Sequence, residues 1–197
     1  MLDIRARKHT SRAVDPIARF LAKIGIRPAA ITIAGLAISI AGAGLIGLGY
    51  LAVGASIVGL GALFDILDGV LARVTGTESV RGAFLDSFTD RVGEVAAFTG
   101  LAFYLGDLGE PALVTLTLVG LAGSLLIPYL RAKAEGEGAI GKGGLMGRAE
   151  RLLLFGFGVG LEGLGLPTLE VTVWALAILT WLTVIQRFYR TWVQLGE

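Results

Sequence analysis

Long apolar blocks separated by short polar stretches make up most of the chain. There are six of these blocks, at residues 28–50, 52–73, 84–106, 111–130, 152–166 and 168–187. Most are near the roughly 20 residues that a helix needs to cross the hydrocarbon core of a bilayer. Because backbone groups in lipid must pair within their own segment, each block is expected to be a helix. The pattern predicts an all-α membrane protein with six transmembrane helices.

A mixed segment at about residues 12–26 precedes the first block. Basic residues lie on the other sides of this segment. Its five apolar residues recur at helical spacing, namely Val14, Ile17, Ala18, Leu21 and Ile24. This arrangement is typical of an amphipathic helix on a membrane surface, and a simple basic tail is the alternative. Residues 1–197 are predicted to form a single membrane domain, in which the cytoplasmic basic segment 1–27 carries this juxtamembrane helix.

Charge is divided unequally between the two ends of these helices. With six crossings, the loops near 50, 107–110 and 163–170 lie on one side, and they contain acidic residues but no lysine or arginine. All 17 basic residues fall on the other side. Since cytoplasmic loops are enriched in Lys and Arg, both termini are predicted to be cytoplasmic, in a protein of the plasma membrane.

Composition supports a membrane protein and narrows the chemistry. The chain is 54% hydrophobic and 17% charged, with a mean hydropathy of +0.76, whereas soluble domains carry about 25% charged residues. It has no cysteine and one histidine, His9. Disulfides, thiolate metal sites and histidine clusters are therefore excluded. The 30 glycines indicate close helix packing in lipid.

Four aspartates stand out because they lie at one end of two neighbouring blocks. Asp65 and Asp68 share a helix face near the cytoplasmic end of the second block, and Asp86 and Asp90 share one near the start of the third. A short loop joins the two blocks. The two pairs are therefore predicted to face each other.

Such crowding of acids requires compensation. Two carboxylates about 5 Å apart repel by roughly 3 kcal/mol at an effective dielectric near 20. Hard oxygen ligands without histidine or cysteine favour Mg²⁺, with Mn²⁺ as the alternative. A pair of such ions about 4 Å apart suits phosphoryl displacement. The opposing interpretation is that these aspartates are solvated helix ends beside a loop.

The neighbouring residues suit a large phosphate-bearing ligand. Gly69, Ala72 and Gly82 keep the aspartate faces open, and Arg73 can pair with phosphate oxygens. The complete pattern is D-x-x-D-G-x-x-A-R, eight residues, and G-x-x-x-D-x-x-x-D. In this pattern, the sequence resembles the CDP-alcohol phosphatidyltransferase family, and the six-segment layout with a juxtamembrane helix resembles that family too.

The resemblance implies roles for individual residues. Asp65, Asp68, Asp86 and Asp90 would bind two Mg²⁺ ions, and Asp90 would also be the general base. The CDP-lipid would contact Gly69, Ala72, Arg73, Ser79 and Gly82, together with Ala29 and Thr32 at the start of the first crossing. An acceptor hydroxyl would attack the lipid-side phosphorus, and CMP would leave. Family resemblance also implies a homodimer.

Basic residues at the cytoplasmic ends of the last three blocks bear on the acceptor: Arg131, Lys133, Arg148, Arg151 and Arg187. They suit an acceptor with its own phosphate, although the positive-inside rule alone also explains them. These segments resemble those of phosphatidylinositol-phosphate synthases and their archaeal counterparts, which implies inositol 1-phosphate as acceptor. Here Arg131 and Lys133 are exchanged in order relative to the bacterial pattern.

Other functions remain open on sequence alone. Glycerol 3-phosphate is the alternative acceptor, because it also carries a phosphate dianion. A small ion or metal transporter is the alternative from another class, since intramembrane aspartates also mark ion paths. Transport explains neither Gly69 and Ala72 nor the confinement of the acids to one membrane edge. A non-catalytic scaffold would tolerate loss of all four aspartates.

Overall fold

The structure is a computed structural model that describes residues 14–196, and within that range every regular element is a helix. A short helical segment at residues 14–23 comes first. Six long helices follow: α2 (Pro28–Gly47), α3 (Leu51–Thr75), α4 (Val80–Asp107), α5 (Pro111–Gly136), α6 (Arg148–Glu162) and α7 (Leu169–Leu195). Each predicted apolar block forms a helix.

Local chemistry explains several of the helix ends. Pro28 and Pro111 begin α2 and α5, where a missing backbone N–H carries no penalty. Gly76 ends α3 with φ of 64°, a left-handed conformation that suits glycine. Ser79 caps α4, and its Oγ accepts a hydrogen bond from Gly82 N at 3.1 Å. The turn between α3 and α4 is therefore fixed at both ends.

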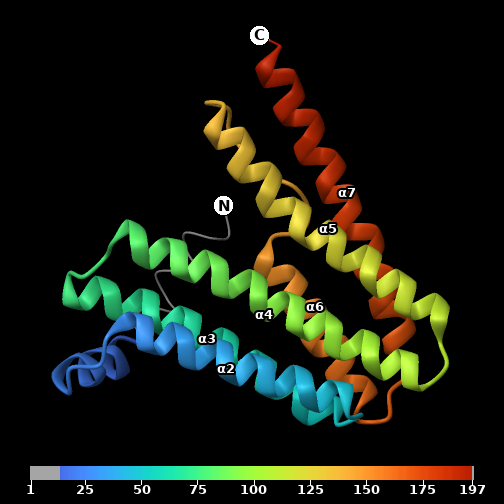
Figure 1. The fold of residues 1–197 in the computed structure, drawn as a ribbon. Coiled ribbons are helices and arrows are strands. Elements are labelled where there is room, and N and C mark those ends of the chain that lie inside the picture. The colour runs from blue at the N-terminus through green and yellow to red at the C-terminus, as the bar shows by residue number, and fades with distance from the viewer. Residues whose placement is uncertain (1–13, 197) are drawn as a thin grey trace.

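The helices form a bundle in which α2 packs against both α3 and α4, while α5 packs against α7 (Figure 1). Helix α6 contacts α3 and α7. In Figure 1, the C-terminal halves of α5 and α7 diverge from α4. The main core includes Phe98, Leu101, Val159 and Leu176, which are contributed by α4, α6 and α7.

Glycines allow the closest helix contact. A Cβ on Gly42 of α2 would lie 2.8 Å from Gly54 O, and a Cβ on Gly54 of α3 would lie 2.7 Å from Gly42 O. No larger side chain fits at either position without moving backbone. This close approach joins the two helices that lead to the site, and it matches the small-residue packing expected in lipid.

Four helices, α2, α3, α5 and α7, are long and apolar enough to cross a membrane. Helix α6 is shorter, at 15 residues, and the first half of α4 carries several charges. Large apolar side chains on the outer surface of all six are exposed, namely Ile40, Leu63, Phe103, Leu118, Phe157 and Trp174. An exposed apolar surface of this extent suits contact with lipid.

The helical segment at residues 14–23 packs on the bundle. Ala18 is fully buried beside Ile31 of α2 and Leu71 of α3, with Val14 and Leu21 against the same cluster. Ile17, Phe20 and Ile24 are instead exposed. The predicted apolar face is therefore divided between the protein and its surroundings. The part of the basic segment at residues 1–13 lies outside the described residues.

The loop between α5 and α6 is bound to α7. Thr183 Oγ1 accepts a hydrogen bond from Met146 N at 3.0 Å, and Gln186 Oε1 accepts one from Leu145 N at 3.0 Å. Arg187 Nε donates to Gly143 O at 2.8 Å. These contacts fix the point at which the chain enters α6, which carries two residues of the site described next.

Candidate active site

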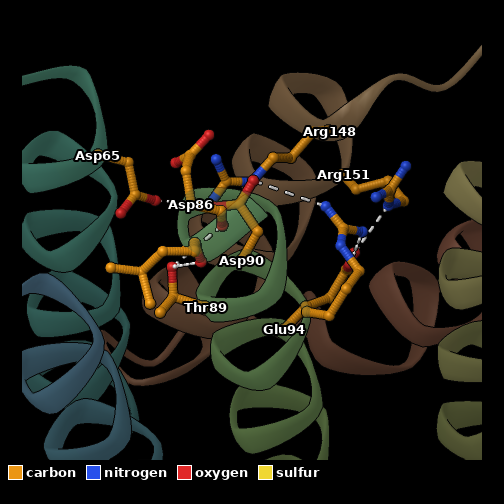
Figure 2. Close-up of polar contacts among 9 residues, drawn as sticks. Asp65, Asp86, Thr89, Asp90, Glu94, Arg148 and Arg151 are labelled. Carbon is orange, nitrogen blue, oxygen red and sulfur yellow. Dashed lines mark hydrogen bonds and ion pairs between the residues drawn. The ribbon is translucent and has the colours of Figure 1, made fainter. Parts of the chain in front are cut away.

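Two of the four aspartates lie on the C-terminal half of α3, and the other two lie on the N-terminal half of α4. Asp65, Asp86 and Asp90 project toward one region between the helices (Figure 2). Asp65 and Asp86 are both close enough to Asp68 to repel its carboxylate. The predicted juxtaposition of the two aspartate pairs therefore exists in the fold, because the turn at residues 76–79 reverses the chain and α2 packs against both α3 and α4.

Arg148, the first residue of α6, lies among these carboxylates. Its Nη2 donates a hydrogen bond to Asp65 Oδ2 at 2.6 Å and lies 2.5 Å from Asp90 Oδ1. The two aspartate side chains are 15% and 11% exposed, so each needs a positive partner. Arg148 supplies that charge from a different helix.

Asp68 is the most deeply buried of the four, at 5% exposure. Thr32 on α2 donates a short hydrogen bond from Oγ1 to Asp68 Oδ2. Thr32 Oγ1 also lies 3.2 Å from Pro28 O. The hydroxyl therefore fixes one oxygen of Asp68 and connects the start of α2 to the site.

Glu94 forms a second acidic position one turn after Asp90. Its Oε1 accepts a hydrogen bond from Arg151 Nε at 2.8 Å, and its Oε2 accepts one from Arg91 Nη1 at 2.6 Å. Arg91 is also 3.7 Å from Asp90 Oδ2. Arg151 is only 3% exposed, and its Nη1 is buried without a hydrogen-bond partner. The carboxylate thus joins α4 to α6.

A small cavity of about 60 Å³, open to the surface, lies among these groups. Asp65, Asp90, Glu94, Arg148 and Arg151 line its polar part. Its apolar wall is formed by residues of α2, α3, α4 and α6, among them Leu36, Val58, Phe98 and Phe155. The arrangement offers anion-binding arginines beside carboxylates, at the edge of an apolar space.

The donor set suits hard divalent cations. Four carboxylates from two helices provide the oxygen ligands that Mg²⁺ and Mn²⁺ prefer, and Asp90 Oδ1 is buried without an aligned hydrogen-bond donor. In the side-chain positions described, no three acidic or histidine side chains converge closely enough to hold an ion. Arg148 lies between Asp65 and Asp90 instead. The residues therefore fit a divalent metal in chemistry and charge, while Arg148 contacts two of the four carboxylates.

The residues predicted to bind the CDP-lipid lie in three settings. Arg73, Ser79 and Gly82 are exposed around the turn between α3 and α4, and Ala72 is half-buried next to them. A Cβ on Gly69 would meet nothing but the end of the Arg73 side chain, at 3.7 Å. The two remaining residues belong to α2, where Ala29 is exposed and Thr32 is buried against Asp68.

The five basic residues predicted to bind the acceptor divide into three groups, of which Arg187 forms the last. Arg148 and Arg151 line the cavity. Arg131 instead pairs with Glu135 at 2.9 Å, and Lys133 pairs with Glu137 on the exposed end of α5. The hydrogen bond from Lys133 lowers the pKa of the Glu137 carboxyl below its ordinary value.

Arg187 makes its contacts with backbone rather than with the cavity. It donates from Nε to Gly143 O at 2.8 Å and from Nη1 to Ile127 O at 2.9 Å. It is nevertheless close enough to Arg131 and Arg151 to feel their charge. Three of the predicted basic residues therefore contribute positive potential to the same region.

Sequence reasoning missed Glu94 and Arg91. The signal was present, because Asp90 and Glu94 are four residues apart and so share a face of α4. An acid in an apolar block also calls for a partner. That partner, Arg151, is 57 residues away in the chain.

Comparison with known proteins agrees with this geometry. The sequence profile described as CDP-alcohol phosphatidyltransferase matches residues 26–189. The phosphatidylinositol phosphate synthase of Mycobacterium marinum is 38% identical over 94% of this chain and 82% of its own length.

Two crystal structures of the Mycobacterium tuberculosis phosphatidylinositol phosphate synthase are also similar. The one with CDP-DAG bound has a TM-score of 0.87 at 38% identity and covers 92% of this chain and 94% of that one. The complex with manganese and citrate has a TM-score of 0.85 at 38% identity, covering 91% and 88%. Motif, fold and sequence likeness agree over most of the chain, which therefore belongs to the CDP-alcohol phosphatidyltransferase family.

Proposed function

We propose that this protein transfers the phosphatidyl-type group of a CDP-lipid to a hydroxyl of inositol 1-phosphate and releases CMP. The observation that carries the proposal is that Asp65, Asp90, Arg148 and Arg151 line the same cavity. Carboxylates that can bind metal and act as a base are thereby placed next to arginines that can bind an anionic acceptor. The similar Mycobacterium marinum protein is named phosphatidylinositol phosphate synthase.

The donor assignment is supported by the motif and by the solved relative with CDP-DAG bound. In this chain the open position at Gly69 directly follows Asp68, and the end of the exposed Arg73 side chain lies beside Gly69. A diphosphate at this place meets little steric hindrance from Gly69, and Arg73 can donate to its oxygens. The apolar outer surface of the bundle provides a lipid-facing path for the tails.

Asp90 is the proposed general base. It accepts the proton of the acceptor hydroxyl as that oxygen forms a bond to the lipid-side phosphorus. The bond between this phosphorus and the bridging oxygen breaks, and the electron pair leaves with CMP. Arg148 and Arg151 hold the phosphate of the acceptor beside this carboxylate. Phe98 and Phe155 belong to the apolar wall of the cavity, and this wall limits the access of water on its side.

Two Mg²⁺ ions, bound by Asp65, Asp68, Asp86 and Asp90, would neutralise the diphosphate and the charge that develops on the leaving group. Support comes from the four carboxylates of the donor set and from the manganese complex of the similar Mycobacterium tuberculosis enzyme. Thr32 would keep one oxygen of Asp68 oriented by its hydrogen bond.

The proposed setting is the plasma membrane, with six crossings and the active site at the cytoplasmic edge. The segregation of all 17 basic residues supports this orientation. The helical segment at residues 14–23 would lie in the interface, with Phe20 and Ile24 toward lipid. A homodimer is part of the proposal, and the exposed apolar helix faces provide surface for it.

The test is CMP release by the purified protein in detergent or nanodiscs with CDP-diacylglycerol and Mg²⁺. Inositol 1-phosphate, glycerol 3-phosphate, inositol and serine are offered one at a time. We expect turnover with inositol 1-phosphate and its loss on chelation. Preferred use of glycerol 3-phosphate would overturn the assignment of inositol 1-phosphate as acceptor. Failure of all four acceptors to support CMP release would overturn the proposed reaction.

A further inference from the structure

Glu94 holds the most deeply buried charged side chain of the cavity. Its Oε1 accepts a hydrogen bond from Arg151 Nε at 2.8 Å, and Arg151 is 3% exposed. The neighbouring Arg91 donates to the other carboxylate oxygen at 2.6 Å. One carboxylate therefore compensates two arginines, which makes burial of Arg151 tolerable.

The contact with Glu94 leaves one donor of Arg151 unused. Nη1 is buried without a hydrogen-bond partner, and Arg151 lines the same cavity as Asp90. A buried donor without a partner is unfavourable, and such groups in native proteins are rare enough to need an explanation. An anion in the cavity would supply the missing partner. Because Glu94 holds Nε, the planar guanidinium has a fixed orientation toward that anion.

Glu94 also relates this arginine to the proposed base. Asp90 and Glu94 are one turn apart on α4, about 6 Å along the helix axis, and Arg91 bridges them at 3.7 Å and 2.6 Å. A ligand that binds Arg151 by its phosphate is therefore positioned relative to Asp90 through the contact of Arg151 with Glu94, which shares α4 with Asp90. Movement of α6 alone would break this relation.

We propose that Glu94 is a positioning residue for the acceptor, which orients Arg151 so that Nη1 binds the phosphate of the acceptor while its hydroxyl reaches Asp90. This inference rests on the proposed function, since it takes a phosphorylated acceptor as given. Glu94 itself need not touch either substrate. Its role is to compensate the charge of Arg151 and to fix the orientation of the guanidinium plane.

The first experiment compares Glu94→Gln with Glu94→Asp and the matched control Glu170→Gln in full-length protein. Glu170 is an exposed acid in the first turn of α7 and does not line the cavity. We expect Glu94→Gln to raise the KM for inositol 1-phosphate by about tenfold or more, the usual effect of losing a charged hydrogen bond. The KM for CDP-diacylglycerol should change less than about twofold, and Glu94→Asp should restore part of the acceptor affinity. Equal changes in both KM values, or a fall in kcat alone, would contradict the inference.

A double-mutant cycle separates positioning from a general structural effect. Because Glu94 acts through Arg151, Glu94→Gln combined with Arg151→Ala should have the same acceptor KM as Arg151→Ala alone. Multiplicative effects would show that Glu94 acts independently and would overturn the inference. If Glu94→Gln does not fold, the same cycle is measured with Glu94→Asp.

The acceptor panel keeps this inference distinct from the proposed function. If wild type uses glycerol 3-phosphate instead, the proposed acceptor is wrong, and the cycle is measured with that substrate. A selective rise in its KM would still support positioning by Glu94. If the wild-type protein binds no phosphorylated acceptor, the proposed function and the positioning role of Glu94 both fail. Normal use of inositol 1-phosphate by Glu94→Gln would contradict the positioning role alone.

Discussion

The Arg148 guanidinium lies 2.5 Å from Asp90 Oδ1 and also donates to Asp65 Oδ2 at 2.6 Å. Both aspartates are proposed metal ligands, so the arginine and a divalent cation compete for the same oxygens. Their charges would repel at this distance. Arg148 therefore stabilises the carboxylates in the absence of a cation and opposes binding of the cation.

Replacing Arg148 should change metal affinity and stability in opposite directions. We expect Arg148→Gln to bind Mn²⁺ more tightly, measured by calorimetry or electron paramagnetic resonance. In chelator, the variant should unfold more readily, by on the order of 2 kcal/mol, because two half-buried carboxylates lose their partner. Added Mn²⁺ should narrow that difference.

The matched control is Arg19→Gln, because Arg19 is exposed on the helical segment at residues 14–23. This control should leave both quantities at their wild-type values. Weaker Mn²⁺ binding by Arg148→Gln would show that the arginine supports the metal site rather than competing with it.

Asp90→Asn tests the general base. A base in position contributes about 10² to 10⁴ in rate, so CMP release should fall by at least about 100-fold. The fold should persist, since an amide is nearly the same size as a carboxylate. Asp107→Asn is the control on the same helix, where the side chain is exposed at the far end of α4. Turnover of Asp90→Asn at the wild-type rate would remove Asp90 from the chemistry.

Thr32→Val tests the support of the buried aspartate. It removes the hydroxyl that donates to Asp68 Oδ2 and leaves that oxygen without its partner, at about 1–3 kcal/mol. We expect a lower unfolding temperature in chelator, with recovery in Thr32→Ser. Thr115→Val is the control, because the exposed Thr115 bonds only to its own helix, at Pro111 O. Equal destabilisation by both valines would mean that the contact with Asp68 contributes nothing specific.

Much of the fold was predictable because its signals are local. Pro28 and Pro111 mark helix starts in the sequence as they do in the structure. The aspartate pairs were predicted to face each other because a short turn leaves α3 and α4 few other arrangements. The spans were harder to define for α4 and α6, since the charges of the site lower the hydropathy of α4 and α6 has 15 residues.

Pairings between distant residues were not predictable. Arg148 and Asp65 are 83 residues apart, and Arg151 and Glu94 are 57 apart. A sequence pattern indicates which side of the membrane an arginine occupies, but not which carboxylate it meets. Arg187 shows the same limitation, because its guanidinium binds the carbonyls of Gly143 and Ile127. Nothing in its local sequence indicates those partners.

That contact leads to a prediction about the loop before α6. Arg187→Ala removes the hydrogen bonds to Gly143 O and Ile127 O, so the loop should leave α7 more often. Limited trypsin digestion should then cut after Lys142 several times faster. Arg187→Lys should be cut at a rate between those of the wild type and Arg187→Ala, because an ammonium cannot form both hydrogen bonds of the guanidinium. The control Arg19→Ala should digest at that bond like wild type, and an unchanged rate in Arg187→Ala would show that the other contacts to α7 suffice.

The proposed orientation can be tested directly because the chain has no cysteine. Single cysteines at Leu108 and Leu164, which are 55% and 73% exposed, probe the turns after α4 and α6. Cysteines at Glu78 and Lys142, both exposed, probe the opposite end of the bundle. With an impermeant maleimide, Leu108→Cys and Leu164→Cys should be labelled in intact cells. Glu78→Cys and Lys142→Cys should be labelled only after lysis, because the positive-inside rule places that end in the cytoplasm. Labelling of Glu78→Cys in intact cells would put the aspartates on the outer side, where a cytoplasmic CDP-lipid and acceptor could not meet them.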